Sequence, residues 1–311
     1  MGDALQALAQ QGIARDSLFL RARSTGRPGE RAGYNHAVAN IYFDLTREFN
    51  ADGPVAALAS GQAVVYYRIA IMSKDGDWVI LETPAACQWV LDVLRLHEAR
   101  YRPSAPLDVR WLAGGWSSHF EFTDDRKRRV RCDFLSRPPR VAAGAATALF
   151  APRRTGDADD GTLLVVDLDS LLRMKQTQRA KDYAVITELA RLLPPDQEIA
   201  FTTDPDTVLA LAARVGVPPQ RHTVRAAADR RDRAAVVAAI AAETDSLQQR
   251  DRKRVACYLA AAERYLEEYR HARLTDLPLA EAHEAACTLA ERWLPLVPPN
   301  LEPPCADAQR G

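Results

Sequence analysis

Two aspartates that stand one residue apart, Asp75 and Asp77, mark the stretch of this chain best suited to chemistry. They lie where the polar residues 73–77 lead into an apolar run. Because successive side chains of a β-strand point to opposite faces, both carboxylates point the same way. Like charges that close need a cation, a proton or basic groups between them. The spacing is typical of a divalent-metal site for phosphoryl or nucleotidyl transfer, although Asp-Gly beside Lys74 is also typical of a hairpin turn.

Two further features fit a site of this kind. Ser60-Gly61 lies between an apolar strand predicted over 55–59 and a helix predicted over 62–70. Small residues there allow backbone N–H groups to approach a phosphate closely, although a plain strand-to-helix turn has the same composition. Asp133 interrupts the apolar strand predicted over 130–135, where a buried carboxylate needs a partner. That partner is either an arginine (Arg131 or Arg137) or a metal ion shared with the first two acids.

A helix predicted over 170–193 carries charge on its apolar stripe. At about 100° per residue, Lys175, Arg179 and Asp182 fall on the same face as the apolar residues of the helix. Charges in such a stripe face either one another or a polar cavity. The first alternative is a buried ion-pair network. In the second, Lys175 and Arg179 reach a triphosphate or a base, and Asp182 orients a cation or acts on a proton.

The elements that must position these residues give a mixed α/β (α+β) fold. Apolar runs predict further strands at 78–82, 107–112, 119–122 and 163–166, with another possible at 198–202. Helices are predicted over 36–49 and, from the Thr83-Pro84 start signal, to residue 100. The chain after 170 is mostly helical. We therefore expect an α/β domain over 1–193, whose first 50 or so residues form an extension, and a mostly helical domain over 194–311.

Together these residues resemble the nucleotidyltransferase superfamily, and most nearly its branch of abortive-infection (AbiEii-like) toxins. The resemblance lies in Ala59-Ser60-Gly61-Gln62-Ala63-Val64 followed by Ser73-Lys74-Asp75-Gly76-Asp77. Asp133 matches the later lone acid of the family, and Lys175, Arg179 and Asp182 match its helix motif. The match covers roughly residues 55–193. It departs from the family at Ser60, where glycine is usual, and at Gly76, where an apolar residue normally separates the two acids.

The resemblance implies Mg²⁺-dependent transfer of a nucleoside monophosphate from a nucleoside triphosphate to an acceptor hydroxyl. Asp75, Asp77 and Asp133 would hold the metal, and Asp133 would also help to activate the attacking hydroxyl. Asp182 joins the catalytic set, and nucleotide binding falls to Ser60, Gly61, Lys74, Lys175 and Arg179. The acceptor could be tRNA or another RNA, a protein or a small molecule, and the protein could be the toxin of a toxin–antitoxin pair with an antitoxin partner. The alternative, favoured by Ser60 and Gly76, is a catalytically inactive relative that serves as a binding or scaffold module.

Composition bears on the binding partners and the cellular location of the protein. The 41 basic and 41 acidic residues give no overall field that would commit the chain to nucleic acid or membrane. No long apolar run predicts a membrane span, and the five scattered cysteines are typical of reduced thiols, so we expect a cytoplasmic protein. The basic run 126–131 is typical of a solvated hairpin, although it could contact RNA. Ser117 and His119 are too close in sequence to predict a hydrolase.

Overall fold

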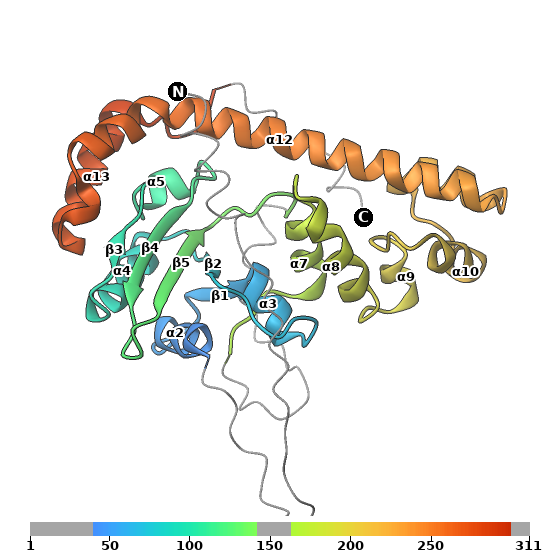
Figure 1. Cartoon of the computed structure of the whole chain (residues 1–311), viewed down its shortest axis with the longest axis horizontal. Helices are drawn as coiled ribbons and strands as arrows, with labels where there is room; N and C mark the ends of the chain where they lie inside the picture. Colours follow the sequence, from blue (N-terminus) through green and yellow to red (C-terminus); the bar gives the residue numbers. More distant parts are fainter. Residues whose placement is uncertain (1–39, 142–162, 300–311) are drawn as a thin grey trace, which may run out of the picture. The chain divides into compact units, whose positions relative to one another are not determined.

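The computed structural model describes residues 40–141 and 163–299. The chain divides into Met1–Asn40 and Ile41–Gly311, and every element below belongs to the second unit. Within the described residues, five strands form one sheet in the order β1-β2-β5-β4-β3 (Figure 1). The strands are β1 (Ala56–Ala59), β2 (Gly76–Ile80), β3 (Arg100–Tyr101), β4 (Ser118–Thr123) and β5 (Arg129–Leu135). The β2–β5 pair is parallel and the other pairs are antiparallel. This mixed sheet with helices around it confirms the predicted fold class.

An aromatic core packs one face of the sheet against α2 (Ile41–Phe49) and α4 (Pro84–Leu96). Trp78 of β2 and Phe134 of β5 stack with ring centroids 5.3 Å apart, and Phe49 packs edge-on against both rings. The buried Trp78 indole N–H donates to the Thr46 hydroxyl (2.9 Å). Because these aromatic residues alternate along their strands with the two acids of β2 and β5, burying them turns Asp77 and Asp133 to the opposite face.

The opposite face is covered over its β1–β2 half by α3 (Ser60–Tyr66), α7 (Leu168–Lys175) and α8 (Ala180–Ala190). Ala57 and Val79 of the sheet pack there in one apolar cluster with Leu171, Ile186 and Leu189 of the helices. The rest of this face, over β5 and β4, carries charged side chains. The sheet therefore has an apolar half and a polar half on one side, and the acids of β2 and β5 lie at the border between them.

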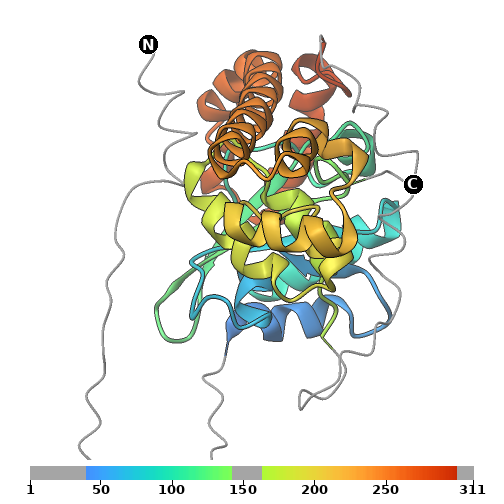
Figure 2. The ribbon, with the colours of Figure 1, turned by 90° about the vertical axis from the view of Figure 1, so that its right-hand side faces the viewer.

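The carboxy-terminal part is helical. It contains α9 (Pro195–Glu198), α10 (Pro205–Val215), α11 (His222–Asp229), α12 (Arg233–His271) and α13 (Leu279–Trp293), with short 3₁₀ turns η1 (Pro219–Arg221) and η2 (Leu274–Asp276). The amino-terminal half of α12 shares an apolar cluster with α10 and α11. Figure 2 shows α12 nearly end-on, beside the other elements. No helix in the described ranges combines the length and apolar character that a membrane span requires.

Tyrosines join α12 to the connection that precedes β4. The Tyr258 and Tyr265 hydroxyls donate to the carbonyl oxygens of Gly114 and Ser104, both at 2.9 Å. Gly115 has φ +83°, and a side chain there would begin 2.3 Å from the Tyr258 hydroxyl oxygen, so only glycine fits this contact. The predicted boundary between residues 193 and 194 stays a prediction.

Four predicted elements were wrong in detail. Residues 107–112 form a loop and the short α5 (Val109–Leu112) instead of a strand, because Asp108 caps the helix by accepting from the Arg110 N–H (2.8 Å). Residues 198–202 end α9 and form a turn. Of 163–166, only Val165 bridges the sheet, beside Leu58. The long helix over 170–193 is two helices, α7 and α8, which residues 176–179 separate.

The break between α7 and α8 has a local and a distant cause. The Thr177 hydroxyl accepts from the Arg179 N–H (3.1 Å), which offers the backbone an alternative to the helix. The Gln178 N–H donates to the carboxylate of Asp251 on α12 (2.9 Å). The predicted stripe of Lys175, Arg179 and Asp182 is therefore not one helix face, although the three side chains still come together across the turn.

Candidate active site

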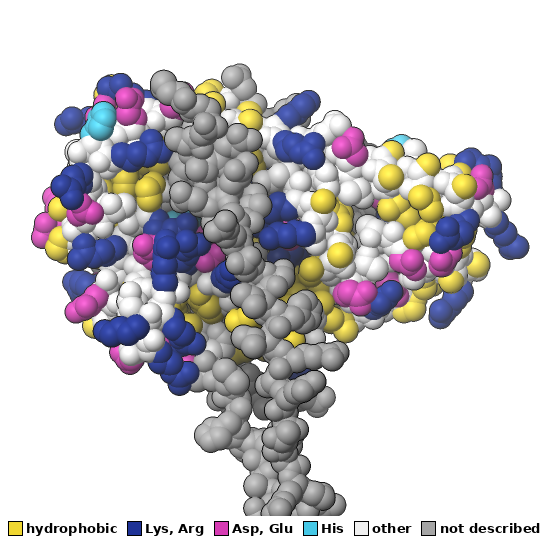
Figure 3. Space-filling view, in the orientation of Figure 1, with side chains coloured by type: hydrophobic (Ala, Val, Ile, Leu, Met, Phe, Trp, Pro, Cys, Tyr) yellow, Lys and Arg dark blue, Asp and Glu magenta, His cyan; other side chains and the backbone are white. Residues whose placement is uncertain are grey.

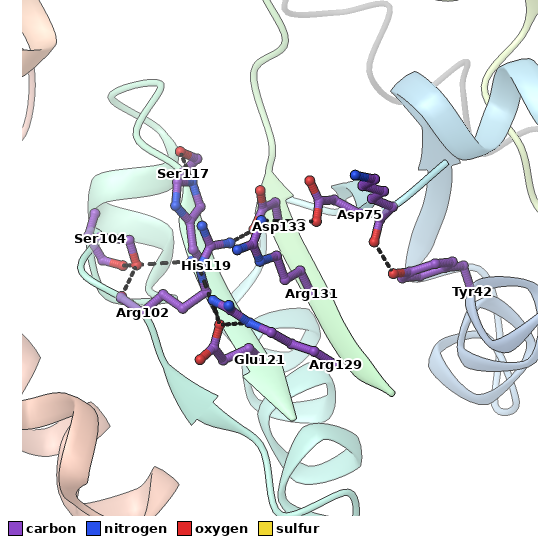
Figure 4. A network of polar contacts seen from close by, with 12 residues as sticks. Tyr42, Asp75, Arg102, Ser104, Ser117, His119, Glu121, Arg129, Arg131 and Asp133 are labelled. Atoms are coloured by element: carbon purple, nitrogen blue, oxygen red, sulfur yellow. Dashed lines mark hydrogen bonds and ion pairs between the residues drawn. The ribbon is translucent and has the colours of Figure 1, made fainter. Parts of the chain in front are cut away.

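The acids predicted from three places in the sequence lie together. Asp77 and Asp133 are register partners in the parallel β2–β5 pair, so their carboxylates project from the same face of adjacent strands, about 4.8 Å apart at the backbone. Asp75 lies just before β2, two residues from Asp77, and its charge acts on both of the other acids. The contacts around Asp75 and Asp133 are shown in Figure 4.

The carboxylates raise one another's proton affinity. Burial raises the pKa of Asp77 to about 7, and the neighbouring charges of Asp133 and Asp75 add to the shift. Burial likewise raises the pKa of Asp133 to about 7, against the opposing effect of Arg102. Solvent still reaches part of both residues. The basic groups present therefore do not compensate these two carboxylates fully, and the pair favours a proton or a cation.

Arginines engage two of the three acids. Arg102 Nη1 donates to Asp133 Oδ1 at 3.1 Å, and Arg131 Nη1 lies 3.5 Å from Asp75 Oδ1. Arg102 follows β3, at the far edge of the sheet, and its role could not be read from the sequence. Its neighbour Arg131 was one of the two arginines expected as partners of Asp133, but it faces Asp75 instead. The other, Arg137, pairs with Glu82 (2.7 Å).

The start of α3 packs directly against the loop that carries Asp75. A side chain on Gly61 would begin 2.2 Å from Ser73 Oγ, so the two segments touch. Gln62 fixes the same loop by donating to the Ser73 carbonyl oxygen (2.8 Å). Ser60 has φ 48° and its side chain forms a hydrogen bond with the Asp77 carboxylate. This left-handed conformation is one that glycine adopts without strain and serine does not.

Lys74 lies at the rim of this loop. Its side chain is exposed, and its carbonyl oxygen accepts a hydrogen bond from the Tyr42 hydroxyl of α2. That contact ties the loop between α3 and β2 to the helix on the other face of the sheet. Together with the contacts of Ser73, it holds the segment that carries Asp75 from both sides.

Lys175 at the end of α7 faces the acids from the helical side. Burial lowers its pKa, while the charges of Asp182 and Asp77 oppose that shift, so the ammonium group lies near both carboxylates. Its Nζ is 4.0 Å from Asp182 Oδ1. Asp182 is itself buried and accepts from Arg179 Nε (2.9 Å) and the Thr177 hydroxyl (2.7 Å). Asp182 therefore belongs to an ion-pair network that positions Lys175 and Arg179.

His119 of β4 is a further member of the site. It pairs in register with Asp133, and its Nε2 shares a hydrogen bond of 2.9 Å with the Ser117 hydroxyl. Burial and the charge of Arg102 lower its pKa to about 4, so the imidazole is neutral at pH 7. A neutral imidazole with this pKa is a weak general base, which disfavours a serine hydrolase. The alternation of His119 with Glu121 along one strand is the sequence signal that could have placed His119 on the polar face.

The site offers a magnesium ion two neighbouring carboxylates, those of Asp77 and Asp133. Among residues 40–141 and 163–299, no group of three or more His, Cys, Asp or Glu side chains is placed to hold a metal ion. Mg²⁺ is commonly held by one or two carboxylates, with water and substrate phosphates as its remaining ligands. Asp77 and Asp133, in register and incompletely compensated, fit that smaller requirement.

Comparisons of the sequence with models of known protein families and with curated proteins find no match. The resemblance to nucleotidyltransferases therefore depends on the motifs and their placement. Chemically, the arrangement offers two carboxylates for a cation, a buried lysine beside them and arginines on either side. Such a set can bind and neutralise phosphates.

Proposed function

We propose that the protein is a Mg²⁺-dependent nucleotidyltransferase, which moves a nucleoside monophosphate from a nucleoside triphosphate to an acceptor hydroxyl. The observation that carries the proposal is the register pairing of Asp77 with Asp133 on neighbouring strands, with the buried Lys175 near Asp77. Three segments far apart in the sequence supply these groups. A chance pairing of surface charges would not bury a lysine beside them.

In the proposed reaction the acceptor oxygen bonds to the α-phosphorus, the bond from that phosphorus to the bridging oxygen breaks, and pyrophosphate leaves. Asp77 and Asp133 would hold Mg²⁺, which supplies charge neutralisation and orientation of the phosphates when bound. Lys175 and Arg179 would bind the triphosphate, positioned by Asp182. Asp133 would help to take the proton of the attacking hydroxyl.

Transfer of label tests the proposal. The full chain is incubated with each α-³²P-labelled nucleoside triphosphate, Mg²⁺ and either total RNA or a cell lysate. We expect label on an acceptor only with Mg²⁺ present, and a loss of at least about a hundredfold in Asp77→Asn, because charge neutralisation supplies most of such catalysis. Asp125→Asn, at an exposed position of the β4–β5 hairpin, is the matched control. Absence of transfer by the wild type, or equal transfer by Asp77→Asn, would reject the activity.

One observation favours a second candidate, a nucleotide-binding module without catalysis. Asp133 and Asp75 both have an arginine partner, at 3.1 Å and 3.5 Å, and a relative that has lost its metal could use such pairs to neutralise its acids. Calorimetry separates the candidates, because nucleotide affinity that rises steeply with Mg²⁺ belongs to the enzyme, and affinity indifferent to Mg²⁺ belongs to the module. The toxin role, the RNA acceptor, the antitoxin partner and the cytoplasmic location stay predictions.

A further inference from the structure

The polar half of the sheet carries arginines in a row beside the acids. Arg102 contacts Asp133 (3.1 Å), Arg131 contacts Asp75 (3.5 Å), and Arg129 contacts Glu121 (2.6 Å). Figure 4 shows these side chains on one side of the sheet, and Figure 3 shows Lys and Arg interleaved with Asp and Glu over this part of the surface. Arg102 and Arg131 are only 24% and 22% exposed, whereas Arg129 is 59% exposed.

Arg102 lies on the opposite side of the acids from Lys175 and Arg179, and Arg131 lies beside the acids, on the same strand as Asp133. In the strand order β1-β2-β5-β4-β3, α7 and α8 cover β1 and β2, while Arg131 lies on β5 and Arg102 follows β3. A triphosphate held by the α7–α8 turn would therefore approach the acids from one side. The arginines would face whatever approaches from the other side, which in a transfer reaction is the acceptor.

A cation at the acids changes what the arginines need. A divalent cation bound between Asp77 and Asp133 competes with Arg102 for the Asp133 carboxylate. Its double positive charge also repels the guanidinium groups of Arg102 and Arg131. With Asp133 given to the metal, Arg102, Arg129 and Arg131 share two carboxylates, Asp75 and Glu121, and Arg102 keeps only Glu121, which lies 3.8 Å away and is already held by Arg129 at 2.6 Å. A guanidinium that is three-quarters buried is costly without a full partner, so this group of arginines then requires one more anion. A phosphate oxyanion meets that need best, because the planar guanidinium binds phosphate through two parallel hydrogen bonds.

We propose that Arg102 and Arg131 form an acceptor-side site for a phosphate group, which binds the acceptor and becomes available when Mg²⁺ and the nucleotide occupy the acids. The inference depends on the proposed function and adds the substrate class, an acceptor that carries phosphate near its attacking hydroxyl. Metal and acceptor would then bind cooperatively. The metal takes the acids and so releases the arginines for the acceptor, and the acceptor phosphate takes the arginines and so releases the acids for the metal.

The test measures this coupling in the full chain. Methyl phosphate and a short single-stranded oligoribonucleotide are titrated calorimetrically, first in EDTA and then at saturating Mg²⁺ and an α,β-non-hydrolysable triphosphate. We expect one or both probes to bind about tenfold more tightly in the second state, and the nucleotide to gain the same factor from the probe, as linkage requires. A gain for methyl phosphate identifies a monoester acceptor, and a gain for the oligoribonucleotide alone identifies a phosphodiester chain.

Three variants make the result specific. Arg102→Gln and Arg131→Gln should abolish the coupling without weakening the binding of Mg²⁺ with nucleotide, because both arginines oppose the metal at the acids. Arg126→Gln should keep the coupling, because this arginine is exposed in the β4–β5 hairpin, whereas Arg129 shares Glu121 with Arg102 and is no neutral control. If either glutamine variant fails to fold, Arg102→Lys and Arg131→Lys keep the charge and lose the two-pronged geometry, so they should retain only part of the coupling.

The outcomes separate this inference from the proposed function. Absence of any Mg²⁺-dependent nucleotide binding would remove both. Normal nucleotide binding without coupling in the wild type would overturn the acceptor site alone. A loss of nucleotide affinity in Arg102→Gln and Arg131→Gln equal to their loss of probe affinity would also overturn it, because the arginines would then belong to the donor site.

Discussion

Replacing Asp77 by asparagine should stabilise the protein in the absence of metal. The pKa of this carboxyl lies at about 7 in the folded protein against 3.8 in a free carboxyl. The folded state therefore holds a proton that the unfolded chain releases between about pH 4 and pH 7. Because the folded state binds more protons there, the free energy of unfolding falls as the pH rises through this window, and the full cost remains above pH 7. The amide side chain of the Asp77→Asn variant carries no charge and should be free of that cost.

The size of the effect follows from the shift. A rise from 3.8 to about 7 corresponds to a cost on the order of 4 kcal/mol, at 1.36 kcal/mol per pKa unit. Solvent reaches part of the side chain and the protein relaxes around a charge, so the realised cost is smaller. We expect Asp77→Asn to raise the free energy of unfolding at pH 8 by about 1 to 2 kcal/mol and to change it little at pH 4.5.

Urea unfolding at pH 4.5, 6 and 8 in EDTA measures the effect, with Asp125→Asn as an exposed control for the loss of one carboxylate. Adding Mg²⁺ with nucleotide at pH 8 should restore stability to the wild type and give little to Asp77→Asn, because a ligand stabilises only the state that binds it. A variant less stable than the wild type at pH 8, or a gain independent of pH, would refute the account of the charge at this site.

Three other changes have definite expected outcomes. Ser60→Gly should raise the free energy of unfolding by up to about 1 kcal/mol through relief of the φ of 48°, measured by urea unfolding, and a clear loss would show that the Ser60 hydroxyl matters more than its backbone. Lys175→Met should weaken binding of Mg²⁺ with nucleotide at least about tenfold in calorimetry. It should keep the melting temperature, because Asp182 retains Arg179 and the Thr177 hydroxyl as partners, and unchanged affinity would take Lys175 out of the site. Asp251→Ala should lower the free energy of unfolding by about 3 kcal/mol, because it leaves Arg254 and the Gln178 N–H without their buried acceptor. A loss of less than about 0.5 kcal/mol in urea unfolding would contradict this.

Local patterns predicted much of this fold because the decisive interactions are local. The Thr83-Pro84 signal starts α4 as expected, with the Thr83 hydroxyl accepting from the Ala86 N–H (3.2 Å). The apolar composition of β1, β2 and β5 predicted these strands. The acids of β2 and β5 stood out because they interrupt an apolar run. Alternation along β2 and β5 was enough to place Asp77 and Asp133 on a face, and their pairing then followed from the sheet.

The features that could not be predicted from the sequence depend on contacts between residues far apart in the chain. Arg102 joins the site only because β3 lies at the sheet edge next to β4, and nothing in its neighbouring residues indicates that register. The α7–α8 break is fixed partly by Asp251, which is 73 residues from the Gln178 N–H that it accepts from. Asp251 stands among basic residues, a composition typical of a solvated surface, yet its carboxylate is fully buried.

The claim on which the rest depends is that Asp77 and Asp133 share a divalent cation. Anomalous diffraction from crystals grown with Mn²⁺ and a non-hydrolysable triphosphate would locate the ion directly. The account predicts one peak bounded by both carboxylates and by phosphate oxygens. A peak held by the phosphates alone, with Asp133 still paired to Arg102, would contradict it.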